Sequence, residues 1–374
     1  MKVLHVITGL DAGGAETQLA MVVRHTRHEC DVVALYNPGP IAEQIMANGT
    51  SVRDLRMRSN RDLRALPRLR ALIVAGRYDV VHAHLYRSQV YARPAARLAG
   101  TPVVVTTEHS IGETHIERRP MSAGVRGLYL ASELFSDQTI AVSEIVKDRL
   151  VRWGVPARKI TVIPNGIDTA ALAFDGEARA RSRARFGIAA DTFVIGTLGR
   201  LDSNKRVDMI IEAAAPLLGE RCALLVVGRG KEMDGLRAVA ARVGVADRVI
   251  LAGFQADTVA MLSAFDLYVQ ASAEETFGLA ALEAMANGLP ALYTTCPALD
   301  GVVTTQARQV TGTVPALRAA LAEAVQVGQR PRKPDDAVFD RYGIGATTQR
   351  IDELYECLWL NRQKPTRPTP RSRA

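Results

Sequence analysis

The sequence alternates short apolar runs with longer amphipathic segments, and this pattern occurs twice along its 374 residues. Apolar, β-branched runs are typical of strands covered on both faces, and such strands build parallel sheets with right-handed crossover helices. The alternation pauses at 167–190, a stretch rich in Ala, Arg and Asp, and then restarts. These features predict an α/β protein with two doubly wound, Rossmann-like domains.

The predicted elements follow this alternation. In the first half the predicted strands are Lys2–Thr8, Cys30–Leu35, Val80–Ala83, Val103–Thr107, Gln138–Val142 and Ile160–Ile163. The helices between them are predicted at Glu16–His25, Ile41–Asn48, Arg61–Ala75, Ser88–Ala99 and Ser143–Trp153. In the second half strands are predicted at Thr192–Leu198, Ala223–Val227, Val249–Ala252, Leu267–Gln270 and Pro290–Tyr293. The remaining helices are predicted at Val207–Leu218, Met233–Val243, Thr258–Phe265, Leu279–Asn287, Val314–Val327 and Tyr342–Leu360.

The same alternation sets the expected domain boundaries. An N-terminal domain is predicted at 1–168, an interdomain linker at 169–190 and a C-terminal domain at 191–340. A helix is then expected at 341–360, followed by a basic tail at 361–374. The tail is rich in Pro and Arg and has no apolar period, so we expect it to be disordered.

Composition narrows the class of protein. Hydrophobic residues make up 48% of the chain and charged residues 23%, which is typical of a globular protein. The apolar start is only as long as a strand, so we expect no signal peptide, and no run reaches the ~20 apolar residues of a membrane span. Cys30, Cys222, Cys296 and Cys357 lack CxxC spacing, which argues against a disulfide framework or a zinc site. Buried free thiols and a cytoplasmic location are therefore expected.

The net charge of +8 is compatible with an anionic partner. Basic residues concentrate at Arg53–Arg70 and in the tail, but no aromatic-interleaved basic stripe accompanies them, so no nucleic-acid partner is expected. The helix predicted at Arg61–Ala75 has an apolar face made of Leu63, Leu66, Leu69, Leu72 and Ile73. Two interpretations stay open: an ordinary surface helix, or a patch that contacts anionic lipid headgroups or a lipid-linked pyrophosphate acceptor.

A first candidate site follows the strand predicted at Thr192–Leu198. The loop Gly199-Arg200-Leu201-Asp202-Ser203-Asn204-Lys205 places Arg200 and Lys205 between the carboxyl end of a strand and the start of a helix. Two cations beside unpaired backbone N–H groups suit a diphosphate and would stabilise charge on a departing nucleoside diphosphate. The alternative is a solvated loop with surface cations.

A second candidate site begins at Ala273-Glu274-Glu275-Thr276-Phe277-Gly278-Leu279. Glu275 precedes the helix predicted at Leu279–Asn287, and Glu283 lies about two turns further along. A helix that opens at Phe277-Gly278-Leu279 presents N–H groups to phosphate, and Gly278 lets a ligand approach the backbone. Because a carboxylate is costly to bury without partners, ribose hydroxyls are expected at Glu283 and sugar hydroxyls at Glu275.

The Glu-x7-Glu motif within EETFGLAALEAMANGLP, preceded by the Gly-Arg…Lys loop, resembles retaining glycosyltransferase family 4, which has the GT-B fold. The first half is also similar to that family. Gly9-x3-Gly13-Gly14-Ala15-Glu16 resembles its first glycine loop, Asp79-Val80-Val81-His82-Ala83-His84 its His-x-His strand end, and Ile163-Pro164-Asn165-Gly166-Ile167-Asp168 its interdomain signature. The matches span roughly residues 1 to 290 in the family's order, which makes the set specific.

The resemblance implies an enzyme; the cytoplasmic location expected from the cysteines stands beside it, with a peripheral membrane contact through Arg53–Arg70 left open. It implies two domains that face each other across a cleft and a transfer that retains the anomeric configuration without a metal or other cofactor. The donor would be a UDP- or GDP-linked sugar and the acceptor a glycan, a lipid-linked or a natural-product molecule. The C-terminal helix would cross back to the first domain.

The resemblance also implies roles for single residues. Arg200 and Lys205 would hold the diphosphate, Glu283 the ribose and Glu275 the transferred sugar. His109, within Thr106-Thr107-Glu108-His109-Ser110, corresponds to the family's active-site histidine, and it would act beside Glu275, Arg200 and Lys205. The other donor-binding candidates are Gly13, Gly14, Phe277, Gly278 and Leu279. Glu16, His82, His84 and Glu108 are the candidates for acceptor contact or positioning, and both His82 and His84 compete with His109.

The chain departs from the family after Pro290. Where the family has a Gly-Gly pair before an acidic residue, this chain has Ala291-Leu292-Tyr293-Thr294-Thr295-Cys296-Pro297-Ala298-Leu299-Asp300-Gly301. We therefore expect a differently shaped pocket for the donor sugar. Two alternative functions stay open: a catalytically degenerate scaffold that binds a nucleotide sugar, and a GT-B enzyme that acts on a sugar phosphate.

Overall fold

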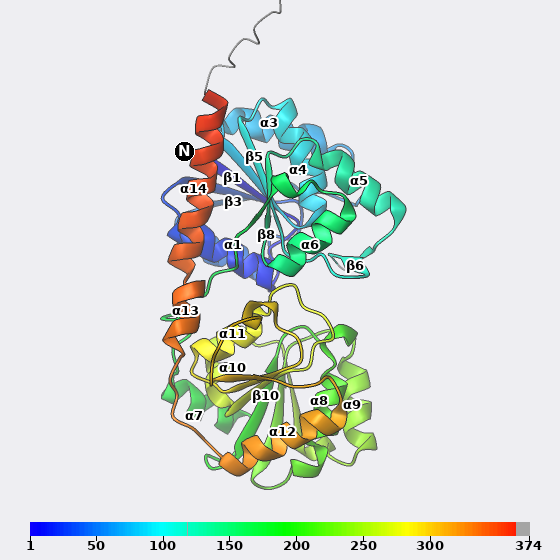
Figure 1. Cartoon of the computed structure of the whole chain (residues 1–374), viewed down its shortest axis with the longest axis vertical. Helices are drawn as coiled ribbons and strands as arrows, with labels where there is room; N and C mark the ends of the chain where they lie inside the picture. Colours follow the sequence, from blue (N-terminus) through cyan, green and yellow to red (C-terminus); the bar gives the residue numbers. More distant parts are fainter. Residues whose placement is uncertain (118, 364–374) are drawn as a thin grey trace, which may run out of the picture. The chain divides into compact units, whose positions relative to one another are not determined.

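The computed structural model describes residues 1–117 and 119–363, and the chain divides into two compact units. Unit 1 comprises Met1–Gly166 together with the chain from Ile344 onward, and unit 2 comprises Ile167–Gly343. Each unit is built on one parallel sheet flanked by helices (Figure 1). Residues 364–374 of the predicted basic tail lie outside the described residues.

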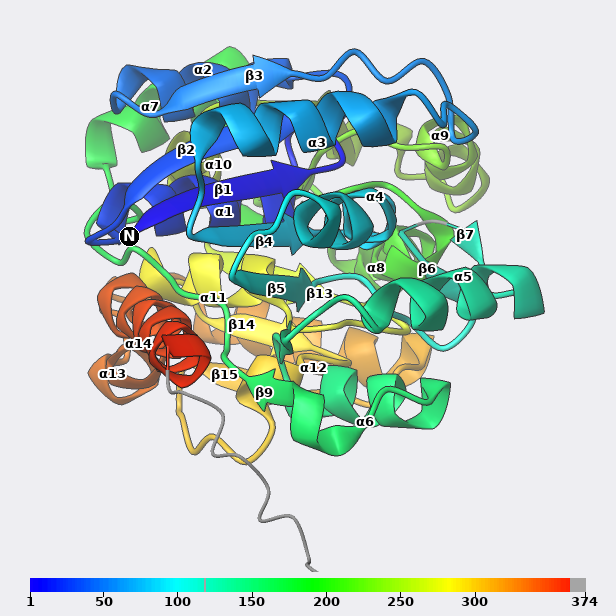
Figure 2. The same ribbon diagram turned by 90° about the horizontal axis from the view of Figure 1, so that it is seen from above.

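Unit 1 contains a seven-stranded parallel sheet and a separate two-stranded hairpin. The strands are β1 Lys2–Ile7, β2 Glu29–Ala34, β3 Ser51–Asp54, β4 Val80–His84, β5 Val103–Glu108, β8 Gln138–Ala141 and β9 Ile160–Val162, with the hairpin β6 His115–Ile116 and β7 Arg119–Pro120. The helices are α1 Gly14–His25, α2 Gly39–Ala47, α3 Ala65–Gly76, α4 Tyr86–Leu98, α5 Ala123–Glu133, α6 Glu144–Trp153 and α14 Ile344–Gln363. The sheet order is β3-β2-β1-β4-β5-β8-β9, so the winding direction reverses between β1 and β4 (Figure 2).

Successive side chains of each strand point to opposite faces of this sheet. Leu4 and Val6 of β1 pack in one cluster with Leu69 of α3 and with α4. Val3 packs on the other face, in a cluster that contains Tyr355 of α14 and residues of α1. The two faces therefore have different helical covers, α3 with α4 and α1 with α14.

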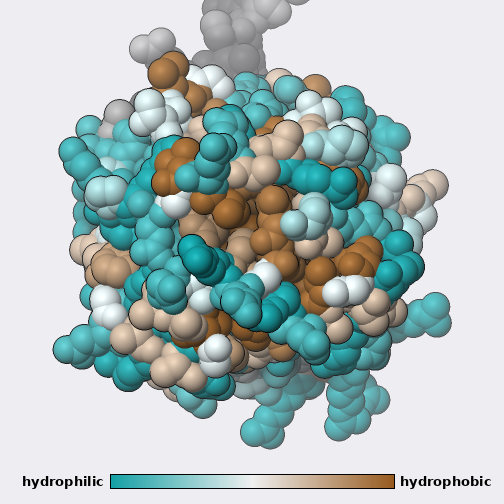
Figure 3. Space-filling model, turned by 90° about the horizontal axis from the view of Figure 1, so that it is seen from below, coloured by the Kyte–Doolittle hydropathy of each residue, from teal (hydrophilic) through white to brown (hydrophobic). Residues whose placement is uncertain are grey.

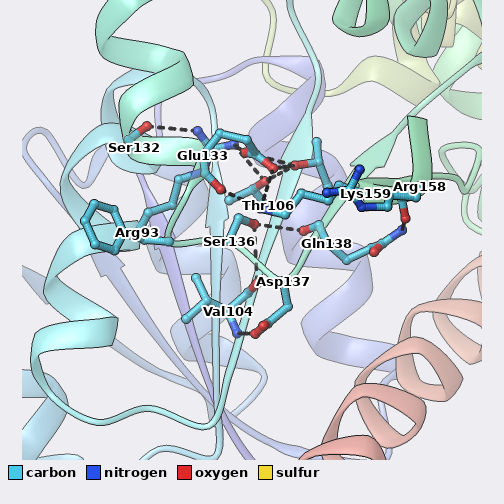
Figure 4. A network of polar contacts seen from close by, with 12 residues as sticks. Arg93, Val104, Thr106, Ser132, Glu133, Ser136, Asp137, Gln138, Arg158 and Lys159 are labelled. Carbon is cyan, nitrogen blue, oxygen red and sulfur yellow. Dashed lines mark hydrogen bonds and ion pairs between the residues drawn. The ribbon is translucent and has the colours of Figure 1, made fainter. Parts of the chain in front are cut away.

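A buried ion pair joins α4 to α5 in unit 1 (Figure 4). Arg93 Nη2 lies 2.5 Å from Glu133 Oε2, and the Arg93 side chain is fully buried. The same guanidinium donates to Ser132 Oγ at 3.0 Å and to Thr106 Oγ1 of β5 at 3.1 Å, while Lys159 Nζ lies 3.8 Å from Glu133. Since a buried charge is tolerated only with partners, this network holds α4 and α5 in place beside β5.

Unit 2 contains a six-stranded parallel sheet in the order β12-β11-β10-β13-β14-β15, which reverses between β10 and β13. Its strands are β10 Phe193–Leu198, β11 Cys222–Val227, β12 Val249–Gly253, β13 Leu267–Gln270, β14 Ala291–Tyr293 and β15 Ala307–Gln309. Its helices are α7 Gly176–Arg185, α8 Val207–Ala214, α9 Met233–Arg242, α10 Thr258–Ala264, α11 Leu279–Ala286, α12 Val314–Val327 and α13 Asp336–Tyr342. Ile210, Leu236 and Leu321 belong to the cluster in which α8, α9 and α12 pack on the sheet.

The segment 169–190, expected to be a linker, contains helix α7, which packs against α10 inside unit 2. Arg179 and Arg183 of α7 each donate to a different oxygen of Asp266 at 2.6 Å. Arg183 also donates to the carbonyl of Thr192 at 2.9 Å. Arg179 and Arg183 therefore hold α7 on unit 2 through largely buried contacts.

Some short elements and single residues also differ from the prediction. The sequence pattern missed β3, β15, α5, α13 and the β6–β7 hairpin. Leu63, expected on an apolar helix face, is 79% exposed because α3 begins only at Ala65. Cys357 is exposed on α14, although buried thiols were expected, and all four cysteines are free.

Within the described ranges no helix combines the length and the apolar character that a bilayer crossing requires. Seen from below, unit 2 presents apolar side chains near the centre of the face and hydrophilic side chains around them (Figure 3). Residues 361–363, expected to begin the disordered tail, continue α14.

Candidate active site

Both sheets reverse their strand order at a switch point, and doubly wound folds bind ligands beyond the carboxyl ends of the strands at such points. In unit 1 the switch lies between β1 and β4, and in unit 2 between β10 and β13. The predicted site residues follow these strands. Gly13 comes after β1, His84 ends β4, Lys205 comes after β10 and Glu275 comes after β13. Each unit therefore carries candidate residues after the strands of its own switch point.

Three histidines gather on one face of the unit 1 sheet. His5 of β1 lies opposite His82 of β4 in the parallel register, and His84 follows two residues later. His82 is bonded on both nitrogens, with Nδ1 2.5 Å from Tyr355 Oη and Nε2 2.7 Å from Thr107 Oγ1. Burial lowers the pKa of His5 to about 3, and it lowers the pKa of His82 and of His84 well below the usual value. All three rings are therefore neutral at physiological pH.

His109, the predicted catalytic histidine, follows β5 directly and is partly exposed, whereas His82 and His84 are 0% and 3% exposed. Its Nε2 lies 3.3 Å from His84 Nδ1, and burial lowers the pKa of His109 to about 4. A cavity of about 20 Å³, room for a water molecule, is lined by His84, His109, Gln18 and Asn165 among others. Of the three competing histidines, His109 is the one with an accessible surface.

Glu108 lies one residue before His109 and is fully buried. Its Oε1 accepts from Ser110 N at 3.0 Å, and its Oε2 lies 3.4 Å from Gln89 Nε2 of α4. Burial raises the pKa of the Glu108 carboxyl to about 7. Because the protein encloses both oxygens, Glu108 is placed to position the His109 segment rather than to contact a substrate.

The first glycine loop leads into α1, with Gly13 at the N-cap and Gly14 as the first helical residue. A Cβ at Gly13 would lie 2.4 Å from Glu16 Oε2, so the glycine leaves room for that carboxylate in the first turn. Gln18, which the sequence analysis did not single out, holds the segment that follows β9. Its Nε2 donates to Gly166 O at 2.7 Å, and its Oε1 accepts from Gly166 N at 2.9 Å.

The ring nitrogens of His5, His82 and His84 lie within 4.8 Å of one another, a separation that a shared metal ion could span. The rings lie face to face at a tilt, since the centroids of His82 and His84 are 4.2 Å apart at an interplanar angle of 32°. Metal-binding imidazoles instead direct their in-plane lone pairs at one point. The nitrogens of these rings bond to each other and to hydroxyl groups, so the cluster fits a hydrogen-bond network better than a metal centre.

In unit 2 the loops after β10 and β13 are tied together. Ala273 N donates to Asn204 O at 2.8 Å. Lys205 Nζ lies 2.6 Å from Glu275 Oε1, and Ser272 Oγ donates to the same oxygen at 2.8 Å. Two of the predicted donor-binding residues, Lys205 and Glu275, are therefore held side by side by contacts within unit 2.

Arg200 and Glu283, the other charged candidates of unit 2, are less constrained. The Arg200 side chain is 46% exposed and lies 3.5 Å from Asp202. Glu283 of α11 is partly buried, and its carboxyl makes no hydrogen bond or ion pair with any residue in the described part of the chain. Burial raises the pKa of Glu283 to about 7. A desolvated carboxyl without partners destabilises a fold, and such groups cluster where ligands bind.

Gly278 caps α11 in a left-handed conformation, with φ at 101°. A Cβ at this position would lie 2.4 Å from Cys296 Sγ, so only glycine fits. Phe277, predicted to bind the donor, is 3% exposed, and its ring packs edge-on against Tyr342 at 5.6 Å. Its side chain is therefore a packing group, which leaves the backbone of this turn and the partly buried Leu279 for a donor.

Unit 2 also contains a glycine loop that was not predicted from the sequence. Gly228 and Gly230 follow β11 and lie against the loop that carries Arg200. A Cβ at Gly228 would lie 1.8 Å from Gly199 O, and one at Gly230 would lie 2.1 Å from Leu201 O. The Gly-x-Gly spacing after a strongly apolar strand was the signal that could have identified this loop.

Comparison with known proteins gives matches for both units. A model described as Glycosyltransferase Family 4 matches residues 12–171, and one described as Glycosyl transferases group 1 matches residues 178–327. The UDP-Gal:alpha-D-GlcNAc-diphosphoundecaprenol alpha-1,3-galactosyltransferase of Escherichia coli is 29% identical over 62% of this chain and 62% of that enzyme. The D-inositol 3-phosphate glycosyltransferase of Salinispora arenicola is 30% identical over 66% of this chain and 59% of that enzyme. This chain thus aligns with about three fifths of each enzyme's length.

Among solved structures, Anabaena HepE in complex with UDP-glucose superposes with a TM-score of 0.82 at 23% identity, over 96% of this chain and 100% of that one. This likeness establishes the fold. Both sheets, their switch points and the two family matches agree on one assignment: the chain has the GT-B fold and belongs to glycosyltransferase family 4.

Proposed function

We propose that this protein is a retaining glycosyltransferase that takes a sugar from a UDP-linked donor bound in unit 2. The observation that carries the proposal is the preassembled Lys205–Glu275 pair together with the unpaired carboxyl of Glu283. Lys205 supplies charge for a diphosphate, and Glu283 supplies an acceptor for ribose hydroxyls. The sequence left UDP and GDP open; UDP is favoured because the Escherichia coli relative is named for UDP-Gal and the HepE structure holds UDP-glucose.

The proposed transfer needs no metal ion. Arg200 and Lys205 would stabilise the negative charge that develops on the departing diphosphate, which is the task that a divalent ion performs in other transferases. The free N–H groups at the start of α11, behind Gly278, would add to this stabilisation. Glu275 would bind hydroxyls of the transferred sugar while Lys205 turns to the phosphate.

His109 is the proposed contact of unit 1 with the reacting sugar. It is the accessible member of the histidine cluster, and its low pKa makes it neutral, so it would act by hydrogen bonding. Glu108 and His84 would hold it in position, since each contacts the same segment from the buried side. Gly13, Gly14 and Glu16 would lie beside the substrates at the start of α1.

The proposed acceptor is an anionic molecule, in the class of lipid-linked diphosphates or sugar phosphates. Arg53–Arg70 carries a group of exposed arginines with no salt bridge in the described ranges: Arg53, Arg56, Arg58, Arg61 and Arg64. The exposed Leu63 lies among them. Basic side chains around an apolar one favour a surface of anionic lipid, so we place the enzyme in the cytoplasm, at the inner face of the membrane.

The test is calorimetric binding of UDP, GDP, ADP and dTDP in EDTA, followed by assay of UDP-sugars for transfer. The proposal predicts binding of UDP in EDTA that is lost in Lys205→Ala. Lys147→Ala, which removes an exposed lysine of α6, is the matched control and should bind UDP as the wild type does. Binding without transfer to any acceptor would favour a nucleotide-sugar-binding scaffold, and no binding of any nucleotide would contradict the proposal.

A further inference from the structure

Two arginines of unit 1 lie over aromatic rings where the strands of its sheet end. Arg87 is in the first turn of α4, shortly after β4, and its Cζ lies 4.7 Å from the ring centroid of Tyr36, just beyond β2. Arg119 belongs to the β6–β7 hairpin that follows β5, and its Cζ lies 5.3 Å from the ring centroid of Tyr86. Both cations therefore come from segments that follow the carboxyl ends of parallel strands.

A third tyrosine, Tyr91 of α4, lies near both guanidinium groups. Burial raises the pKa of its hydroxyl, with Asp62 adding to this, and the positive charges of Arg87 and Arg119 oppose the increase. Asn60, in the loop between β3 and α3, accepts from Tyr91 Oη through its carbonyl at 3.1 Å. The side-chain oxygen of Asn60 accepts from Arg119 Nη2 at 3.2 Å. Arg87 and Arg119 therefore belong to one cluster at this edge of the sheet.

Arg87 differs from a structural arginine because its guanidinium lacks an acceptor. Within residues 1–117 and 119–363 this group makes no hydrogen bond or ion pair, and its Nε is buried. Glu117 Oε2 accepts instead from the backbone N–H of Arg87 at 3.0 Å, and Asp62 pairs with Arg68 at 2.8 Å. A guanidinium shielded from water is costly without acceptors, and doubly wound folds bind ligands at this edge. An anionic ligand therefore fits the cluster.

We propose that Arg87 and Arg119 form a phosphate subsite for the acceptor. Planar guanidinium groups bind phosphate oxygens in a bidentate manner, and the rings of Tyr36 and Tyr86 hold their planes in place. The exposed arginines of Arg53–Arg70 would attract an anionic surface, whereas this subsite would bind one phosphate group of the acceptor itself. The inference rests on the proposed anionic acceptor and names the residues that hold its phosphate.

The direct test is calorimetric titration of the full chain with inorganic pyrophosphate, in the presence of excess UDP to fill the proposed donor site. The subsite predicts that pyrophosphate binds the wild type and that Arg87→Met and Arg119→Met each weaken this binding by about tenfold or more. If UDP does not bind, the same titration is made on Lys205→Ala proteins without UDP. Absence of pyrophosphate binding, or equal binding by the wild type and both variants, would overturn the subsite.

Two further titrations identify the source of the phosphate. N-acetylglucosamine 1-phosphate represents a soluble sugar phosphate, and phosphatidylcholine vesicles with and without phosphatidic acid represent a phosphate at a lipid surface. Arg87→Met should weaken binding to at least one of these two probes. Arg24→Met, which removes an exposed arginine near the end of α1, is the control and should bind both as the wild type does. Equal losses in Arg24→Met and Arg87→Met would indicate a general effect of charge and overturn the subsite.

Stability and kinetics separate this inference from a structural role and from the proposed function. Arg87→Met removes a charge without a partner, so the Tm without ligand should stay the same or rise, and a large fall would overturn the subsite. In transfer assays Arg87→Met should raise KM for a phosphorylated acceptor about tenfold and leave KM for the UDP-sugar within about twofold. Pyrophosphate binding that depends on Arg87, without transfer to any acceptor by the wild type, would contradict the proposed function alone.

Discussion

Glu108 in unit 1 and Glu283 in unit 2 are two carboxyl groups whose pKa burial raises to about 7, yet their surroundings differ. Glu108 is enclosed by hydrogen bonds from Ser110 and Gln89. Glu283 makes no such contact among the described residues. The two oxygens of Glu108 therefore have partners within unit 1, whereas the carboxyl of Glu283 in unit 2 is left for a ligand to satisfy.

The largest expected effect is the loss of stability when the buried Arg93–Glu133 pair of unit 1 is broken. Arg93→Met leaves the buried Glu133 with Lys159, 3.8 Å away, as its remaining cationic partner, and should lower the free energy of unfolding by about 3–5 kcal/mol. Arg242→Met, which breaks the exposed pair with Glu212, is the control and should cost at most about 1 kcal/mol. Urea denaturation of both variants measures the difference, and equal losses would show that the network of Figure 4 adds nothing special to unit 1.

In unit 2, Lys205→Ala should weaken UDP binding by about 30- to 100-fold, because a charge-assisted hydrogen bond to phosphate contributes roughly 2–3 kcal/mol. The free energy of unfolding without nucleotide should change by less than about 1 kcal/mol, since Glu275 keeps its bond from Ser272. Calorimetry and denaturation together test this separation. A fold that collapses in Lys205→Ala would mean that the pair is structural.

The pH dependence of stability sharpens the comparison between the two carboxyls. A folded-state pKa raised to about 7 means that the native protein holds a proton that the unfolded chain releases near pH 4.5. Stability is therefore lost as pH rises from about 4.5 to 7, by roughly 1–3 kcal/mol for Glu283. Glu283→Gln should remove its part of this loss, as denaturation at pH 5 and pH 8 would measure.

Saturating UDP should change the contribution of Glu283 to the pH dependence of the free energy of unfolding, because the proposed ribose hydroxyls would bond to its carboxyl. The contribution of Glu108 should stay the same, because its carboxyl already has partners within unit 1. Glu108→Gln is the matched variant. An identical response of both variants to UDP would remove the distinction between the two sites.

The smallest effect concerns the exposed arginines of unit 1. Arg64→Ser should reduce partition onto vesicles that contain anionic lipid by about fivefold, since each basic residue near such a surface contributes roughly 1 kcal/mol. Arg242→Ser in unit 2 is the control. Co-sedimentation with anionic and with zwitterionic vesicles checks this, and equal binding to both vesicle types would count against a membrane contact through Arg53–Arg70.

Sequence patterns predicted the long elements and the two doubly wound domains because buried parallel strands such as Val80–Ala83 are apolar without alternation. They failed where structure depends on specific contacts. The helix α7 was missed because its arginines bind Asp266 and backbone carbonyls, which composition does not show. Leu63 was misplaced because the helix begins four residues later than predicted.

For the site, the charged motif residues could be predicted because their spacing is local to two loops. The pairing of Lys205 with Glu275 could not, because seventy residues separate them and only the neighbouring strands β10 and β13 bring their loops together. The contact between His5 and His84 could not be predicted either, because it depends on the register between β1 and β4.

Hydrogen–deuterium exchange of the full chain with and without UDP, in EDTA, would locate the donor site. UDP should protect the backbone amides of 199–205 and 272–283, which lie at the switch point of unit 2, and leave the buried strands of unit 1 unchanged. Protection confined to unit 1, or no protection at concentrations that saturate the calorimetric signal, would contradict a donor site built on Lys205, Glu275 and Glu283.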